Sequence, residues 1–275
     1  MHRLIFCINS GRSGSEYLYR ILDTAQNVRA FHEPEPDMAG RILPRYPASR
    51  PSLLDRLAYV PVYVRKYQKI RAIRRIIDEL PTGHIYAETN HMFILAFHDV
   101  VVNHLKNVDV ILLRRYLPAV VKSFVELDHF TPQCRLTRFW FTSPNSPSAV
   151  APALAPDGDL DQIDRIIGYL VDVEARARRF IARHPNTRVV SVRLAELNHL
   201  KVRALFATLG LEEGPDMAKL VGGVVNSKPG HKRKVGKSVS IDYCHKRIQQ
   251  YLAKCARQGL ELPDLPHIEA WRLAS

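Results

Sequence analysis

Glycine, serine and arginine gather in one short segment near the start of the chain, Gly11-Arg12-Ser13-Gly14-Ser15. Glycines let the backbone come close to a bound anion, hydroxyls donate hydrogen bonds to it, and the guanidinium of Arg12 adds a fixed positive charge. Where such a turn opens a helix, the first backbone N–H groups and the positive end of the helix dipole point at the same place. The segment therefore predicts a phosphate or sulfate site, with an ordinary serine-capped turn as the alternative.

The segments on both sides of this turn have the patterns that an anion site requires. Residues 4–8 form a short apolar run, typical of a buried parallel strand, and apolar side chains then recur at helical spacing over residues 17–22. The turn lacks the lysine that follows the second glycine of a Walker A loop, and its glycines are too far apart for the dinucleotide-binding motif. No acidic residue at a strand end stands out as a magnesium ligand, which also counts against an ATP-dependent kinase.

A second pair of polar residues follows a later strand. Arg115 comes directly after Arg114 and the strand expected over residues 109–113. Ser123 lies eight positions further along, on the helix expected over residues 118–124. An arginine at a strand end with a serine eight positions later resembles the 3′-phosphate site of the PAPS-dependent sulfotransferases. Because eight residues make roughly two helical turns, both side chains can face one anion. Arg114 is the neighbouring candidate, and an arginine pair that ends a strand near a surface serine is the alternative.

Strands and helices alternate along the chain. Residues 28–31 form a further apolar patch, which runs into residues 32–36, where two prolines exclude a regular element. The proline-rich stretch 131–158 is expected to be an ordered lid or a mobile loop. The alternation indicates an α/β fold with a mainly parallel sheet. Strands are expected at residues 4–8, 84–88, 109–113 and 188–192, and helices at 17–22, 51–80, 93–105, 118–124, 159–184, 199–209 and 242–257.

The chain is strongly basic, with 40 Lys and Arg against 27 Asp and Glu, which gives its 275 residues a net charge of +13. This balance favours anionic partners such as nucleic acid, phosphorylated small molecules or acidic glycans, and it does not choose among them. With 46% hydrophobic residues the composition is globular, and the apolar runs are far shorter than the roughly 20 residues of a membrane span. Four scattered cysteines without a C-x-x-C pair indicate a reduced, cytoplasmic protein with no zinc site.

The two anion motifs, in this order, resemble those of the PAPS-dependent sulfotransferases, in particular the bacterial and carbohydrate type. The turn at residues 11–15 is similar to the loop that holds the 5′-phosphosulfate group in that family, and the pair Arg115 and Ser123 is similar to its 3′-phosphate site. Residues 31–34 (Phe-His-Glu-Pro) resemble a Phe-Glu-Pro segment of the family, and residues 88–91 resemble its Glu-Lys-Thr-Pro segment without the lysine. The resemblance implies a three-layer α/β sulfotransferase fold, similar to that of P-loop NTPases, with helices on both sides of the sheet.

The resemblance also implies a single domain over residues 1–275, with inserted segments at about 45–80 and 131–158 that bind the acceptor. It implies PAPS (3′-phosphoadenosine 5′-phosphosulfate) as the sulfuryl donor, and no metal. The general base it implies is Glu33, with the adjacent His32 and then His91 as further candidates. A packed histidine and a loop glutamate paired with an arginine are the structural alternatives. Arg12 is expected to act in catalysis as well as in binding. The residues expected to bind the donor are Gly11, Arg12, Ser13, Gly14, Ser15, Glu16, Arg114, Arg115, Ser123, Lys228, Lys232, Arg233 and Lys234.

The acceptor implied by the resemblance is a hydroxyl or an amine of a carbohydrate or a small natural product. The rival enzyme is a P-loop small-molecule kinase. The rival without catalysis is a nucleic-acid-binding protein that uses the basic stretches 65–75 and 228–237. No recognised nucleic-acid-binding module occurs in the sequence, which favours a small-molecule or glycan partner. The oligomeric state, a homodimer included, is left open.

Overall fold

The computed structural model describes residues 2–36, 38, 53–131, 149–152, 154, 160–221 and 236–265, and of residues 53–62 it describes the backbone alone. These residues form two compact units. Within the described residues, the first unit comprises those up to 38, 65–115 and 181–221, and the second comprises the remainder. Two long helices, α2(Leu53–Asp78) and α6(Gln162–Arg183), begin in the second unit and end in the first.

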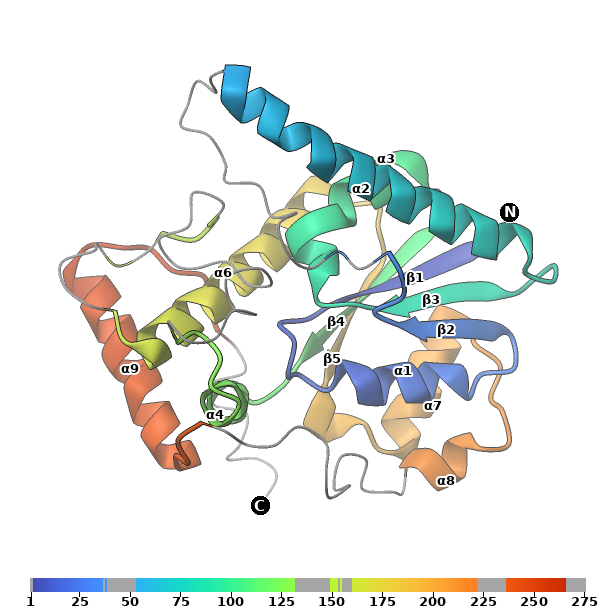
Figure 1. Cartoon of the computed structure of the whole chain (residues 1–275). Coiled ribbons are helices and arrows are strands. Elements are labelled where there is room, and N and C mark those ends of the chain that lie inside the picture. The colour runs from blue at the N-terminus through green and yellow to red at the C-terminus, as the bar shows by residue number, and fades with distance from the viewer. Residues whose placement is uncertain are drawn as a thin grey trace. The chain divides into compact units, whose positions relative to one another are not determined.

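A sheet of five parallel strands forms the centre of the first unit (Figure 1), in the order β2-β3-β1-β4-β5. Because all its strands run the same way, their carboxyl ends meet at one edge and their amino ends at the other. The strands are β1(Arg3–Ile8), β2(Val28–His32), β3(Ile85–Thr89), β4(Val108–Arg114) and β5(Val189–Arg193).

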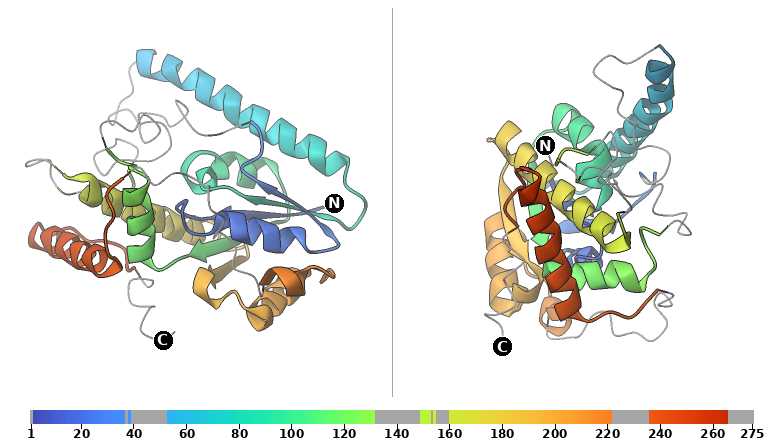
Figure 2. Two further views of the ribbon diagram at one scale, coloured as in Figure 1. Left: turned by 60° about the horizontal axis from the view of Figure 1, so that its bottom comes forward. Right: turned by 90° about the vertical axis from the view of Figure 1, so that its left-hand side faces the viewer.

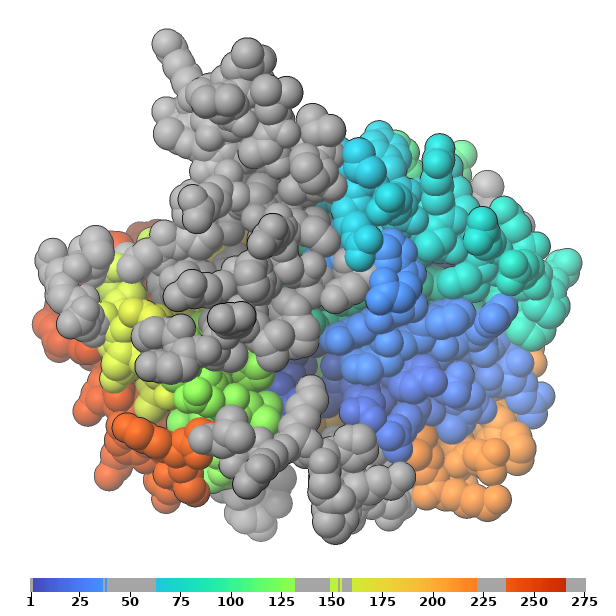
Figure 3. All heavy atoms as spheres, in the orientation of Figure 1, coloured from blue at the N-terminus to red at the C-terminus, as the bar shows by residue number. Residues whose placement is uncertain are grey.

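Helices cover both faces of this sheet, which is why its inner strands are continuously apolar. On one face Leu18 of α1 and Phe206 of α7 pack against Ile111 of β4 in one buried cluster, and the space-filling view shows α8 beside α1 (Figure 3). On the other face the ring of Phe93 stacks on that of Phe6 of β1 with centroids 5.0 Å apart. The further elements of this unit are α1(Ser15–Asp23), the π-helical turn η1(Phe93–Phe97), α3(His98–His104), the 3-10 turn η2(Leu194–Glu196), α7(His199–Leu209) and α8(Met217–Val221).

The second unit is helical in its described part. Its helix α4(Leu117–Glu126) packs against α9(Ile241–Arg257), as both views in Figure 2 show. The ring of Phe124 meets that of Tyr169 of α6 edge-on, with centroids 6.0 Å apart. Arg247 of α9 donates hydrogen bonds to Asp161 and Asp164 at 2.7 and 3.0 Å, and these ion pairs attach α9 to the start of α6.

The structure confirms the predicted α/β class with a parallel sheet flanked by helices, and each predicted strand is present. It adds β2, where the sequence shows only an apolar patch, the 3-10 turn η2 and the short helix α8. The helix expected over residues 93–105 begins with a π-helical turn before it continues as α3. Most of the predicted loop 131–158 lies outside the described residues. Of the helices described, none has the length and apolar composition to cross a membrane.

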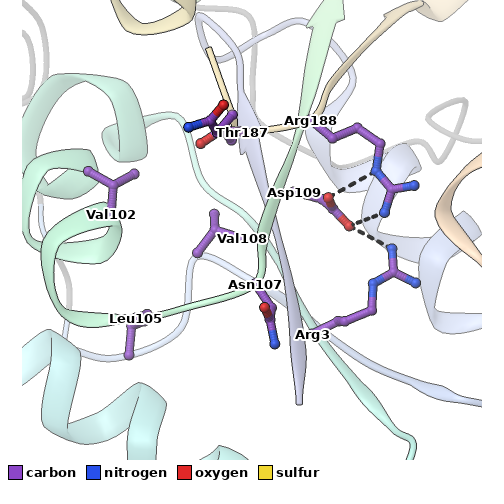
Figure 4. A pocket seen from close by; sticks show the side chains of 9 residues that line it. Arg3, Val102, Leu105, Asn107, Val108, Asp109, Thr187 and Arg188 are labelled. Atoms are coloured by element: carbon purple, nitrogen blue, oxygen red, sulfur yellow. Dashed lines mark hydrogen bonds and ion pairs between the residues drawn. The ribbon is translucent and has the colours of Figure 1, made fainter. Parts of the chain in front are cut away.

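Two arginines and one aspartate hold the strands together at the amino-terminal edge of the sheet (Figure 4). Asp109 of β4 accepts a hydrogen bond of 2.6 Å from Arg3 of β1 and one of 2.7 Å from Arg188, which directly precedes β5. Arg188 also donates to the carbonyl oxygen of Thr208 in α7 at 2.8 Å. With Asn107 and other residues these charged groups line an open cavity of about 650 Å³. Because the charges pair with one another across three strands, we assign the cluster a structural role.

Replacing Asp109 with asparagine is expected to destabilise the protein at neutral pH and to matter less as the pH falls. Burial raises the pKa of Asp109, but hydrogen bonds and charges from Arg188 and Arg3 outweigh it and hold the pKa below its ordinary value. A group whose pKa is lowered on folding stabilises the protein above its unfolded pKa, and this contribution disappears as the pH falls through the folded value. In urea unfolding we expect the substitution to lower the free energy of unfolding by about 1–2 kcal/mol at pH 7, and by less below about pH 4.

The matched control is Asp216→Asn, which removes an exposed ion pair with Lys219 and is expected to change stability by less than about 0.5 kcal/mol. If Asp109→Asn lowered the free energy of unfolding equally at pH 7 and below about pH 4, the structural role assigned to this ion-pair cluster would be contradicted.

Candidate active site

The two anion motifs of the sequence follow neighbouring strands at the carboxyl edge of the sheet. In the register of β1 and β4, Ile8 lies opposite Leu112. In the strand order, β2 lies on one side of β1, and β5 lies on the opposite side, next to β4. The chain that leaves β1 and the chain that leaves β4 therefore run toward opposite edge strands of the sheet. In open α/β sheets, ligands bind outside the carboxyl ends of strands at such a point of divergence. The topology therefore puts the candidate site between residues 9–15 and Arg115.

The turn after β1 has an unusual backbone. Gly11 has a φ of 69°, Arg12 of 53° and Gly14 of 93°, all in the left-handed region. Glycine adopts this region freely, whereas for a residue with a side chain, such as Arg12, it costs roughly 1–2 kcal/mol. Strain of this kind is concentrated at functional sites, where the surrounding structure enforces it.

Asn9 holds the turn in this shape. Its side chain is 1% exposed, and its Oδ1 accepts hydrogen bonds from the backbone N–H of Gly11 at 2.9 Å and from the hydroxyl of Ser13 at 3.4 Å. The first of these bonds is an Asx turn, which asparagine forms readily two residues ahead of the N–H it binds. Sequence reasoning did not give Asn9 a role, although an asparagine between a buried strand and a glycine turn is the local signal for one.

Gly14 opens α1 and cannot be replaced without steric conflict. A Cβ atom added there would lie 2.6 Å from Cδ1 of Leu194, which follows β5. The glycine therefore meets two needs, because it takes the positive φ and lets η2 pack closely against the turn. As a capping residue it brings no side-chain oxygen, so the capping position leaves the first N–H groups of α1 available to an external anion.

The two arginines that end β4 point in different directions. Nη1 of Arg115 donates a hydrogen bond of 2.9 Å to the carbonyl oxygen of Arg12, so its guanidinium lies against the turn. Arg114 instead donates at 3.0 Å to the hydroxyl of Ser191 on β5. Arg115 thus reaches the anion loop, whereas the hydrogen bond of Arg114 joins β4 to β5.

Positive charge accumulates at this place. Burial lowers the pKa of Arg12, and the carboxylate of Glu16 opposes this shift. Burial also lowers the pKa of Arg115, and the positive charge of Arg12 lowers it further. Both guanidiniums stay protonated at any physiological pH, so the two like charges repel each other. Anionic groups bound at these guanidiniums would relieve that repulsion and form charge-assisted hydrogen bonds.

Glu16 is placed differently from the serines of the turn. Its Oε1 accepts a hydrogen bond of 2.8 Å from Arg20, one helical turn further along α1, and both side chains are well exposed. This is an ordinary i,i+4 ion pair on a helix surface, and the contact of Glu16 with the donor stays a prediction.

Glu33 follows β2 at the same carboxyl edge, and both its backbone and its side chain are held there. Its φ is 49°, and its backbone N–H donates to the carbonyl oxygen of Thr89 at 3.2 Å. Its Oε1 lies 2.7 Å from Nδ1 of His91, and the side chains of Glu33 and His91 are 40% and 7% exposed. Because a carboxylate only accepts, Nδ1 of His91 carries the hydrogen. A half-exposed carboxylate aimed by a buried imidazole can accept a proton from a bound molecule.

His32 lies beside Glu33 and is bonded to the end of β3. Its Nδ1 lies 3.1 Å from the carbonyl oxygen and 2.9 Å from the hydroxyl of Thr89, and its ring stacks on that of Tyr19 at 6.0 Å. A carbonyl oxygen only accepts, so Nδ1 of His32 carries the hydrogen in this contact. In the neutral ring, Nε2 is then the atom that can take a proton.

For several residues named in the sequence analysis, the role at this site stays a prediction. Ser123 lies on α4, which belongs to the second unit, and its partnership with Arg115 stays a prediction. The donor contacts of the basic loop fall outside the described residues, namely Lys228, Lys232, Arg233 and Lys234.

Comparisons with solved structures find the same fold in sulfotransferases. The chain is similar to the sulfotransferase domain from the curacin biosynthetic pathway, with a TM-score of 0.52 and 14% identity over 96% of this chain and 99% of that one. It is similar to the sulfotransferase from Alicyclobacillus acidocaldarius, with a TM-score of 0.51 and 13% identity over 99% of both chains. Comparisons with models of protein families and with curated protein sequences find no match. At such identities the likeness establishes the fold.

Proposed function

We propose that this chain, which has the sulfotransferase fold, moves a sulfuryl group from PAPS to a hydroxyl or an amine of a carbohydrate or small natural-product acceptor. The other product is adenosine 3′,5′-bisphosphate (PAP). The observation that carries the proposal is the 2.9 Å hydrogen bond from Arg115 to the carbonyl oxygen of Arg12, because it shows that Arg115 contacts the turn. A ligand with two phosphates could use both motifs, one for each phosphate.

The residues of the turn fit the 5′ end of such a donor. The left-handed glycines, the start of α1 and the guanidinium of Arg12 supply backbone N–H groups and charge for a phosphate. At the other end, Arg115 would hold the 3′-phosphate together with Ser123 and the lysines and arginine of the basic loop. This second contact is what would distinguish PAPS from a nucleotide without a 3′-phosphate.

In this proposal the side chains of the chain position the reactants and handle one proton. When bound, PAPS supplies the sulfuryl group, whose bond to the 5′-phosphate oxygen breaks as the acceptor atom bonds to sulfur. Glu33 accepts the proton that the acceptor loses, and the hydrogen bond from His91 keeps its carboxylate in place. Arg12 and the turn N–H groups stabilise the negative charge left on the 5′-phosphate, and removing one such donor typically costs about 10²–10³-fold in rate.

The likeness of fold and the two arginines at the turn favour this function over the rivals. A P-loop kinase would place the lysine of its phosphate loop after the second glycine, where this chain has Ser15. A nucleic-acid-binding protein would use the basic stretch 65–75, but Lys66 there is paired with Asp99 at 2.7 Å and Lys69 is buried.

The test is turnover of PAPS with a panel of acceptors that spans sugars, phenols, amines and natural-product alcohols. We expect one acceptor class to gain the mass of one sulfate, with release of PAP and no loss of rate in EDTA. Parallel reactions with ATP and magnesium test the kinase. The absence of PAP binding in calorimetry, together with phosphate transfer from ATP, would overturn the proposal in favour of the kinase.

A further inference from the structure

Lys69 of α2 forms a buried ion pair with Glu88 of β3. Its Nζ lies 2.8 Å from Oε1 of Glu88, and both side chains are 0% exposed. The same Nζ donates to the carbonyl oxygen of Pro34 at 2.7 Å and lies 5.3 Å from the ring centre of Phe97. Lys69 therefore connects a helix, a strand and the loop in which Glu33 immediately precedes Pro34.

The carboxylate of Glu88 accepts two further hydrogen bonds. Its Oε2 accepts a hydrogen bond of 2.6 Å from the hydroxyl of Tyr86, and its Oε1 accepts one of 2.9 Å from the side chain of Asn90. Burial raises the pKa of Tyr86 and the Glu88 carboxylate raises it further, so the phenol keeps the proton that it donates. Asn90 in turn accepts from the backbone N–H of Met92. Each partner of the buried carboxylate is thereby fixed in orientation.

Such a pair is a poor source of stability. The cost of removing two charges from water is of the same size as their attraction, and apolar residues of similar volume often do as well or better. What an apolar pair cannot supply is the bond from Nζ to the carbonyl oxygen of Pro34. The specific consequence of a lysine at position 69 is therefore the position of the loop after β2.

A second cation of α2 contacts the same loop. Arg65, one helical turn before Lys69, has its Nη2 4.0 Å from Oε2 of Glu35. Residues four apart share a helix face, so this face of α2 follows the loop from Pro34 to Glu35. The contact of Arg65 is mostly exposed and weak, whereas that of Lys69 is buried, so Lys69 is the anchor.

We infer that Lys69 is a positioning residue for Glu33, an inference that rests on the proposed function. The lysine holds the backbone on the far side of Glu33, the carbonyl of Thr89 holds its N–H, and His91 aims its carboxylate. The left-handed backbone of Glu33 is enforced from both sides. Lys69 also supplies an ammonium to Glu88, next to the point where the sequence lacks the lysine of the Glu-Lys-Thr-Pro pattern.

The test compares two double variants. Lys69→Met with Glu88→Gln removes both buried charges together, which avoids leaving one of them unpaired and is expected to keep the fold. Lys66→Met with Asp99→Asn removes the neighbouring ion pair of α2, which makes no contact with the loop in the described structure. Urea unfolding checks both variants, and PAP calorimetry is expected to give the wild-type affinity for both.

Two measurements then decide the inference. For the Lys69 variant, we expect kcat for the acceptor found in the panel to fall by about 100-fold, since a displacement of roughly 1 Å has that effect. We also expect the NMR signal of the Nδ1 proton of His91, in histidine-labelled protein, to lose its carboxylate-bonded position. The control variant should keep both.

A Lys69 variant that folds and keeps both kcat and the His91 signal would overturn the inference. Failure of the proposed function would give a different result, because the wild-type protein would then neither bind PAP nor transfer sulfate to any acceptor. In that case the His91 signal still reports whether Lys69 orients Glu33.

Discussion

Arg115→Ala is expected to weaken binding of PAP by about 10–100-fold and to weaken binding of adenosine 5′-monophosphate (AMP) far less. A hydrogen bond to a charged group contributes about 1.5–3 kcal/mol, and each 1.4 kcal/mol is tenfold in affinity. Arg12→Ala, by contrast, should weaken both ligands by a similar factor, since it removes a contact to the 5′-phosphate that they share. Calorimetry with the two nucleotides on each variant gives the four affinities.

The control for this experiment is Arg203→Ala on α7, which removes one positive charge from an exposed ion pair with Glu213. It should leave both affinities unchanged. An equal loss of PAP and AMP affinity in Arg115→Ala would show that this residue only supports the turn through the carbonyl of Arg12. Unchanged affinity in both alanine variants would show that the nucleotide does not bind at this site.

Glu33→Gln is expected to lower kcat by about 10²–10⁴-fold while the affinity for PAP stays at its wild-type value. Glutamine keeps the shape of the side chain, and its Oε1 can still accept the hydrogen bond from His91, so the loop should not move. It cannot accept the acceptor proton. The measurement is single-turnover transfer from PAPS to the acceptor identified in the panel, beside PAP calorimetry.

Glu79→Gln is the matched control, because Glu79 is 61% exposed and pairs only loosely, at 4.0 Å, with Arg29. It should retain wild-type turnover. If Glu33→Gln kept its turnover, the base would have to be His32 or His91, and the corresponding glutamine variants would distinguish these two.

The parts of the site that depend on local sequence were predictable. Residues 4–22 contain a buried strand, a glycine turn and an amphipathic helix in direct succession, and each leaves its own pattern within a few residues. The turn at residues 11–15 could be recognised because its geometry needs glycine at two positions, and both glycines have positive φ in the structure. The change from strand to helix after β4 was predictable from the same kind of local pattern.

The parts that depend on tertiary contacts were not predictable. Strand order decides that β1 and β4 are neighbours, and no single segment contains that information. Lys69 is one of six cations within residues 65–75, and its helical spacing does not distinguish it from the exposed ones. Only the packing of α2 over η1 and β3 shows that Lys69 is buried and that Glu88 neutralises it. Arg114 and Arg115 are likewise equivalent in the sequence, and the hydrogen-bond partners of each separate them.

The buried pair also restricts how related chains can diverge. Losing Lys69 alone would leave a carboxylate without its counter-charge in the interior, and losing Glu88 alone would do the same to an ammonium, each at roughly 3–5 kcal/mol. Related sequences should therefore replace both residues together, or replace one of them by an uncharged residue first. In an alignment of homologues, positions 69 and 88 are expected to covary more strongly than positions 66 and 99, whose ion pair is partly exposed to solvent.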